Sequence, residues 1–262
     1  MYPELLHIGP WSLRTYSVVT EIGIVVGVIA AYAAARRQGV RGETFFDVAI
    51  WTVIAGIVGS RLYYVLVNWE LERFADEPMR ILYSWEGGLV FQGAIAGSLL
   101  ALLVLARLRR LPFLLIADIG AVGLPLGHTI GRFACFFQGC CYGLPTDLPW
   151  GVQFPNHDTP VHPTMIYESI ANFLIFAVLW HLDKRKRFLG LTFSLYLILY
   201  SSVRFANEFL RGDPADVLWG LRVAQWVSLG TTILGVLLLA ILWLRTASAH
   251  RAAKGETEAS SP

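Results

Sequence analysis

Charged residues are scarce in this 262-residue sequence, where Asp, Glu, Lys and Arg together make up only 15%. Hydrophobic residues make up 55%, and the mean hydropathy is positive. This composition excludes an ordinary soluble domain and is typical of integral membrane proteins. No internal repeat is apparent, so we expect one membrane domain.

Cysteine is also scarce, with only Cys135, Cys140 and Cys141. These cysteines do not follow Cys-x-x-Cys spacing, so the sequence predicts no zinc site, and no cofactor is expected. Outside the cytoplasm a disulfide is chemically possible, but an odd number leaves at least one thiol unpaired within a monomer. Packing as small buried residues is the alternative for all three.

The first ten residues lack a basic region followed by an apolar run, so no cleavable signal peptide is expected. A helix that crosses a bilayer needs about 20 apolar residues. The sequence predicts an all-α integral membrane protein with about seven transmembrane helices, near residues 17–35, 49–67, 88–106, 112–130, 166–181, 189–205 and 223–244. Residues 1–245 form the predicted membrane domain, and residues 246–262 are predicted to be a disordered cytoplasmic tail.

Basic residues are concentrated in alternate connections between the predicted helices. Most of the 21 lysines and arginines follow the first, third, fifth and seventh predicted spans. By the positive-inside rule that side is cytoplasmic, which places the amino terminus outside. The connections near residues 68–87, 131–165 and 206–222 are then expected on the outer side, where they form an outward-facing polar site.

The stretch around which the chain is organised is residues 127–143, which is rich in glycine, and we expect it to fold tightly at the outer membrane surface. It contains Arg132 and the three cysteines, and its polar continuation reaches His162, Tyr167 and Glu168. A helix that begins at Pro163 or Thr164 explains the local geometry of that continuation, but it does not explain why three polar side chains crowd the outer rim.

Other polar residues occur close to the predicted outer ends of the helices. Arg61 either reaches the lipid headgroups or binds a phosphate, and Gln92 needs a hydrogen-bond partner in protein or substrate. Arg204, Glu208 and Arg211 are four and three residues apart, so they share a helix face. They form either a salt-bridge ladder or a rigid clamp for an anionic headgroup.

Together these residues resemble the bacterial prolipoprotein diacylglyceryl transferases, over nearly the full length up to about Leu244. The resemblance is carried by Tyr16, Gly59-Ser60-Arg61 with Tyr64-Val65-Leu66, Gly131-Arg132 followed by His162-Pro163-Thr164 and Tyr167-Glu168, and Arg204-x-x-x-Glu208-x-x-Arg211. It implies a seven-span enzyme of the bacterial plasma (inner) membrane. Such enzymes transfer a diacylglyceryl group from phosphatidylglycerol to the thiol of the lipobox cysteine in a preprolipoprotein signal peptide, and they release glycerol phosphate.

The resemblance also implies roles for individual residues, with membrane lipid and the signal peptide as partners and no nucleic acid. The expected catalytic residues are Arg132, Arg204, His162, Tyr16 and Gln92. The expected substrate-binding residues are Arg61, Glu208, Arg211, Cys135, Gln138, Cys140 and Tyr167. The nucleophile is the thiol of the substrate, so no catalytic cysteine is needed.

The sequence departs from the family pattern at four of these positions. Cys135 and Gln138 stand where the family usually has asparagine, Cys140 where it has glutamate, and Gln92 where it often has histidine. Glutamine cannot take up a proton near neutral pH, so the base is either His162 or His128, or arginines alone stabilise the thiolate. The alternatives are a diverged paralogue with another acceptor or lipid, and a non-catalytic membrane protein.

Overall fold

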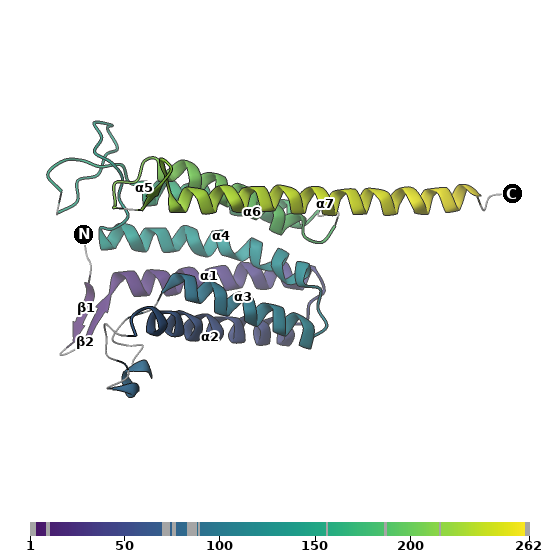
Figure 1. The fold of residues 1–262 in the computed structure, drawn as a ribbon, viewed down its shortest axis with the longest axis horizontal. Helices are drawn as coiled ribbons and strands as arrows, with labels where there is room; N and C mark the ends of the chain where they lie inside the picture. The colour runs from purple at the N-terminus through teal and green to yellow at the C-terminus, as the bar shows by residue number, and fades with distance from the viewer. Residues whose placement is uncertain are drawn as a thin grey trace. The chain divides into compact units, whose positions relative to one another are not determined.

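The computed structural model describes residues 4–8, 11–69, 74, 77–82, 88, 90–155, 157–185, 188–214 and 216–259. The described residues form seven α-helices, which confirms the predicted number (Figure 1). They are α1 (Thr15–Arg37), α2 (Gly42–Val67), α3 (Phe91–Leu108), α4 (Phe113–Gln138), α5 (Thr164–Asp183), α6 (Leu191–Glu208) and α7 (Val223–Ala259).

Five of these helices are long and apolar enough to cross a membrane, namely α1, α2, α4, α5 and α7. Helix α3 provides a shorter apolar segment, Gln92–Leu108. Helix α6 is less apolar because it carries Ser201, Arg204, Asn207 and Glu208. The chain is therefore a multi-pass membrane protein, and α6, which is not among these five apolar helices, carries site residues predicted from the sequence.

The chain divides into two units, and each is held together by closely packed glycines. Unit 1 contains residues 1–34 and 117–262, and unit 2 contains residues 35–116. In unit 1, a Cβ atom on Gly127 would lie 3.0 Å from the carbonyl oxygen of Gly23. In unit 2, a Cβ atom on Gly59 would lie 3.0 Å from the Cα atom of Gly97. Small residues thus let helix backbones approach closely, as in many membrane proteins.

Two short β-hairpins precede helices, and the sequence did not predict either of them. Strand β1 (Glu4–Ile8) pairs with β2 (Trp11–Arg14) before α1, and β3 (Val217–Leu218) pairs with β4 (Leu221–Arg222) before α7. The second hairpin turns at Trp219 and Gly220, which have φ values of 50° and 80°. Positive φ at both turn residues matches the twist of paired strands.

Helix α4 continues to Gln138, so the prediction of a tight turn over all of residues 127–143 was wrong. The backbone turns only from Gly139, which has a φ of 72°. Gly127 serves close packing against α1, and Ala134 and Cys135 are buried in the last turns of α4. Glycine in a membrane helix indicates close contact as readily as it indicates a turn.

Helix α5 begins at Thr164, and Pro163 is its N-cap residue. The Thr164 hydroxyl does not cap the helix. It donates instead to the carbonyl oxygen of Cys141, at 2.6 Å. This bond ties the start of α5 to the turn after α4.

Asp118 is a structural carboxylate near the start of α4, away from the polar residues that gather at the helix end. It is fully buried and accepts hydrogen bonds from the backbone N–H groups of Gly190 and Phe193, both at 2.8 Å. A carboxylate in this place satisfies backbone donors that the start of α6 would otherwise leave unpaired.

Helix α7 reaches Ala259, past residue 246, where the sequence predicts a change to a disordered tail. Residues 260–262 lie outside the described residues, as do the side chains beyond Ala249. The disorder and the cytoplasmic position of this tail stay predictions.

Candidate functional site

One end of unit 1 contains the C-terminal ends of α4 and α6 together with the N-terminal ends of α5 and α7 (Figure 1). The segments that follow α4 and α6 are joined through their backbones. Gly143 and Arg211 pair through their backbones in an isolated antiparallel β-bridge. The N–H of Leu144 donates to the carbonyl oxygen of Leu210 at 2.8 Å. Segments nearly 70 residues apart in the chain thus hold one polar site.

The carboxylate of Glu168 on α5 is the centre of this site and is fully buried. Arg132 Nη2 donates to Glu168 Oε1 at 2.8 Å, and Arg204 Nη1 lies 4.0 Å from Oε2. His128 Nε2 lies 3.8 Å from Oε1, and the amide of Asn207 donates to Oε2 at 3.3 Å. A buried carboxylate needs such partners because desolvation of an unpaired charge is costly.

A second buried carboxylate, Glu208, continues the network along α6. Arg204 Nη2 lies 2.8 Å from Glu208 Oε2, and Arg222 Nη1 donates to Oε1 at 3.2 Å. Arg222 also donates to the backbone carbonyl of Arg211 at 2.9 Å. We call the side chains of Arg132, Arg204, Arg222, Glu168 and Glu208 the arginine cluster.

The arginine cluster carries one net positive charge, because it contains three guanidinium groups and two carboxylates. Arg222 also lies 3.8 Å from Asp213, but Asp213 is paired with Arg211, so this neighbouring pair adds no net charge. Arg132 Nε and Arg204 Nη1 are buried and make no hydrogen bond within the described part of the chain. A buried donor without an acceptor is costly, and the guanidinium fork suits the oxygens of a phosphate. The cluster therefore has the charge and the donors to hold one monoanion.

Arg211 does not share Glu208 with Arg204, so the clamp that the sequence suggested has different members. Its guanidinium makes two hydrogen bonds to Asp213, at 2.7 and 2.8 Å, and Arg222 takes its place on Glu208. Burial by itself raises the pKa of Asp213, but the bonds from Arg211 outweigh it and hold the pKa below its ordinary value of 3.8.

Replacing Asp213 by asparagine is expected to lower stability at neutral pH and to flatten its decline in acid. Because the pKa of Asp213 is lower in the folded than in the unfolded chain, its contribution is present above about pH 4 and is lost as the pH falls through the folded value. Thermal unfolding in detergent from about pH 7 to pH 3 measures this. Asp158→Asn, at an exposed carboxylate, is the control. An equal decline in Asp213→Asn and the unmodified chain would contradict the assignment.

His162 lies in a separate aromatic group beside the arginine cluster, before the first turn of α5. Its Nδ1 lies 3.2 Å from the hydroxyl of Tyr167, and Trp150 Nε1 donates to the same hydroxyl at 2.8 Å. The structure thus brings together His162 and Tyr167, both predicted from the sequence, and adds Trp150.

The three cysteines lie at the end of α4 and in the turn that follows it. Cys135 is buried, and it packs with Phe154 and Met165. Tyr16, at the start of α1, is within electrostatic range of the three thiols and of Arg132. Gln138 is exposed at the last residue of α4. Tyr16 and the cysteines therefore lie near Arg132, and their contact with substrate stays a prediction.

Arg61 and Gln92 belong to unit 2. The Arg61 guanidinium donates to the backbone carbonyls of Ile81 at 2.9 Å, Arg80 at 2.5 Å and Gly88 at 3.3 Å. These bonds tie Arg80, Ile81 and Gly88 to α2. Gln92 is exposed in the first turn of α3. A substrate role for either residue stays a prediction.

Sequence reasoning assigned no role to Glu168 or Arg222, although both are central to the arginine cluster. A signal for Glu168 was present, because a glutamate close to a membrane helix needs a partner and two arginines were expected at the same level. No comparable signal marked Arg222, whose position depends on the hairpin of β3 and β4.

The fold and the site define a class of protein, a multi-pass helical membrane protein with a buried cluster of arginines and glutamates at one end of its helices. A family model described as prolipoprotein diacylglyceryl transferase matches residues 3–241. The chain belongs to the prolipoprotein diacylglyceryl transferase family.

Curated relatives match over nearly their full lengths. The phosphatidylglycerol–prolipoprotein diacylglyceryl transferase of Trichormus variabilis is 38% identical over 257 residues, which cover 93% of this chain and 90% of the relative. The protein of the same name from Gloeobacter violaceus is 37% identical over 262 residues, 96% of each chain. That from Clostridium tetani is 35% identical over 242 residues, 90% of this chain and 96% of the relative.

Proposed function

We propose that this chain transfers a diacylglyceryl group from phosphatidylglycerol to the thiol of a lipobox cysteine in a preprolipoprotein. The sulphur of the acceptor attacks the glyceryl carbon that bears the phosphate, so a carbon–sulphur bond forms and the carbon–oxygen bond breaks. The departing oxygen keeps the phosphate, and glycerol phosphate is released. The observation that carries the proposal is the arginine cluster, in a chain that matches transferases over most of its length.

The arginine cluster fits the phosphodiester of phosphatidylglycerol in charge and in donors. That headgroup carries one negative charge, which equals the net positive charge of the cluster. Arg132 Nε and Arg204 Nη1 supply buried donors for its oxygens. Their charge also stabilises the negative charge that builds on the leaving phosphate.

Glu168 and Glu208 have a positioning role in this proposal. Glu168 holds Arg132 on α4 and approaches Arg204 on α6, and Glu208 holds Arg204 and Arg222. Guanidinium groups fixed before the lipid arrives need little reorganisation when charge develops. Tyr16, Cys135, Gln138 and Cys140 are proposed to contact the substrate beside Arg132.

We propose His162 as the acceptor of the thiol proton, because the Tyr167 hydroxyl holds its ring, whereas His128 faces the guanidinium groups of Arg132 and Arg204, which oppose a further positive charge. His162→Asn is expected to lower the transfer rate at neutral pH about 100-fold, the usual contribution of a base. The same reaction at a pH above the thiol pKa, about 8.5, should recover most of the rate, because the thiolate then forms unaided. The matched variant His128→Asn should show no such gain in rate between neutral and high pH. Equal pH profiles for the two variants would contradict this assignment.

The orientation that we propose places the amino terminus and the arginine cluster on the outer side of the bacterial plasma membrane. The basic ends of α1 and α3 then face the cytoplasm. A lipobox cysteine in a secreted precursor would reach the cluster from that outer side.

The proposed function is tested with purified protein in detergent, phosphatidylglycerol and a lipobox peptide. The peptide is expected to gain the mass of a diacylglyceryl group. A peptide with serine in place of its cysteine should gain none, and phosphatidylcholine should be a poor donor because its headgroup carries an additional positive charge. Equal modification of the cysteine and serine peptides would refute attack by the thiol.

A further inference from the structure

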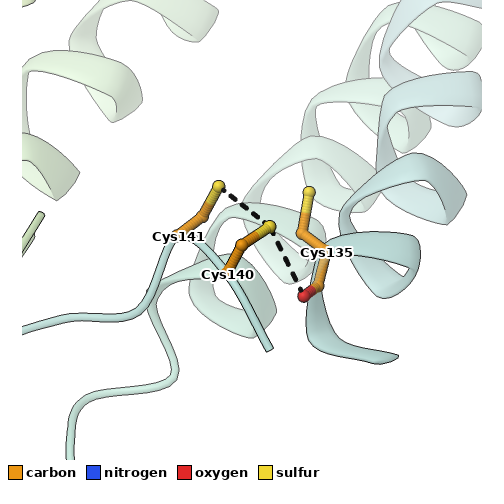
Figure 2. A group of neighbouring side chains, drawn as sticks. All are labelled: Cys135, Cys140 and Cys141. Atoms are coloured by element: carbon orange, nitrogen blue, oxygen red, sulfur yellow. Dashed lines mark hydrogen bonds between the residues drawn. The ribbon is translucent and has the colours of Figure 1, made fainter. Parts of the chain in front are cut away.

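The three cysteines form a sulphur cluster that the proposed transfer does not use as a nucleophile. The Sγ atoms of Cys135, Cys140 and Cys141 all lie within 4.8 Å of one another. Figure 2 shows the three sulphurs gathered at the end of α4, and the Sγ atoms of Cys140 and Cys141 are 3.4 Å apart. The sequence spacing gave no such signal, because the backbone turn brings the thiols together.

The turn that gathers the sulphurs is fixed by several contacts. Gly139 has a φ of 72°, and the N–H of Cys140 donates to the carbonyl of Cys135 at 3.2 Å. Cys141 has a φ of 65°, a left-handed conformation that residues with a side chain rarely adopt. The Thr164 hydroxyl holds the Cys141 carbonyl. The thiols are therefore positioned by the fold around them.

The distances between the sulphurs suit a single bound metal ion. Bonds between a metal and thiolate sulphur are about 2.3 Å long, so three sulphurs around one ion are separated by roughly 4 Å. The three Sγ atoms already lie within 4.8 Å of one another, and small side-chain rotations would complete the geometry. A disulfide, by contrast, would use only two of the three free cysteines.

The chemistry of the donors selects the class of metal. The group consists of sulphur alone, with no histidine or carboxylate among its described members. Thiolates favour soft cations such as Cu(I), whereas Zn(II) would need a fourth ligand from outside the group. Arg132 and Arg211 lie within electrostatic range of Cys141 and offset the negative charge of bound thiolates.

We propose that Cys135, Cys140 and Cys141 form a three-sulphur binding site for a soft, thiophilic cation of the Cu(I) class. On binding, the three thiols release their protons and three sulphur–metal bonds form, with no change in oxidation state. This site goes beyond the proposed transferase function and does not rest on it.

The test uses the full chain in detergent, kept reduced by a phosphine and supplied with Cu(I) held by a competing chelator. We expect one copper per chain after gel filtration, and X-ray absorption should show three sulphurs at about 2.3 Å. Cys140→Ser should lower the affinity at least tenfold and leave two sulphurs on any bound copper. Met79→Leu removes an exposed sulphur in unit 2 and should bind copper like the unmodified chain.

Three results would overturn the proposal. The first is a Cys140→Ser variant that binds copper as tightly as the unmodified chain. The second is an X-ray absorption spectrum of the unmodified chain in which nitrogen or oxygen supplies the ligands. The third is an unmodified chain that retains no copper. The spectrum of the unmodified chain does not depend on whether any variant folds.

Discussion

Replacing Glu168 by glutamine is expected to lower the free energy of unfolding by about 3–5 kcal/mol, the cost of breaking a buried ion pair. Glu168 is fully buried, and its carboxylate faces Arg132 at 2.8 Å and Arg204 at 4.0 Å. Glutamine keeps the shape of the side chain but removes the negative charge. The guanidinium groups of Arg132 and Arg204, both partly buried, then lose the negative charge that they share, and this loss destabilises unit 1.

Denaturant-induced unfolding in detergent measures this effect, with Glu43→Gln as the matched control. Glu43 pairs with Arg41 at 3.6 Å, but both side chains are more than 80% exposed. Exposed pairs contribute about 0–1 kcal/mol, so the control should unfold close to the unmodified chain. A Glu168→Gln variant as stable as the control would show that the cluster does not hold the helices together.

Replacing Arg132 by alanine is expected to lower the transfer rate by about 100- to 1,000-fold, as the loss of a charge-stabilising donor does in other enzymes. Arg132 supplies a buried Nε donor in the proposed phosphate site. Alanine also leaves Glu168 without its nearest partner, so stability should fall together with the rate. A second variant is needed to separate these two effects.

Arg132→Lys provides that separation, because lysine keeps the positive charge beside Glu168 but lacks the planar fork of donors. We expect it to unfold close to the unmodified chain and yet to transfer at least about tenfold more slowly. Arg41→Ala, at an exposed position, should keep the full rate. A fully active Arg132→Lys variant would show that transfer does not need the planar fork of guanidinium donors.

Much of the fold could be predicted because long apolar segments leave the chain little choice in a bilayer. The number of helices and their approximate positions are correct for the described residues, and the spacing of Arg204 and Glu208 correctly placed both on one helix face. Helix ends were less predictable. Helix α4 runs eight residues past its expected end at 130, because its glycines pack against α1 and do not turn the backbone.

The partners of the charged residues could not be predicted, because they depend on tertiary contacts. Arg211 was expected to share Glu208, but it bonds Asp213 two residues away, and Arg222 reaches Glu208 through a hairpin that sequence patterns did not reveal. Arg61 holds three backbone carbonyls in unit 2. A list of arginines in a sequence therefore names the candidates for a phosphate site but not the members.

The family departures at Gln92, Cys135, Gln138 and Cys140 make the acceptor the most informative part of the proposed reaction. The arginine cluster accounts for binding a phosphate and stabilising a leaving group, and these needs are shared by any enzyme that cleaves the same lipid bond. What separates the proposed transferase from a diverged paralogue is where the diacylglyceryl group goes.

The most direct test measures both products of one reaction, with purified protein, phosphatidylglycerol and a lipobox peptide in detergent. Glycerol phosphate release and the mass of the peptide are followed in the same samples over time. The account predicts that one glycerol phosphate appears for each modified peptide and that both depend on Arg132. Glycerol phosphate without modified peptide, or neither product from folded protein that binds phosphatidylglycerol, would contradict it.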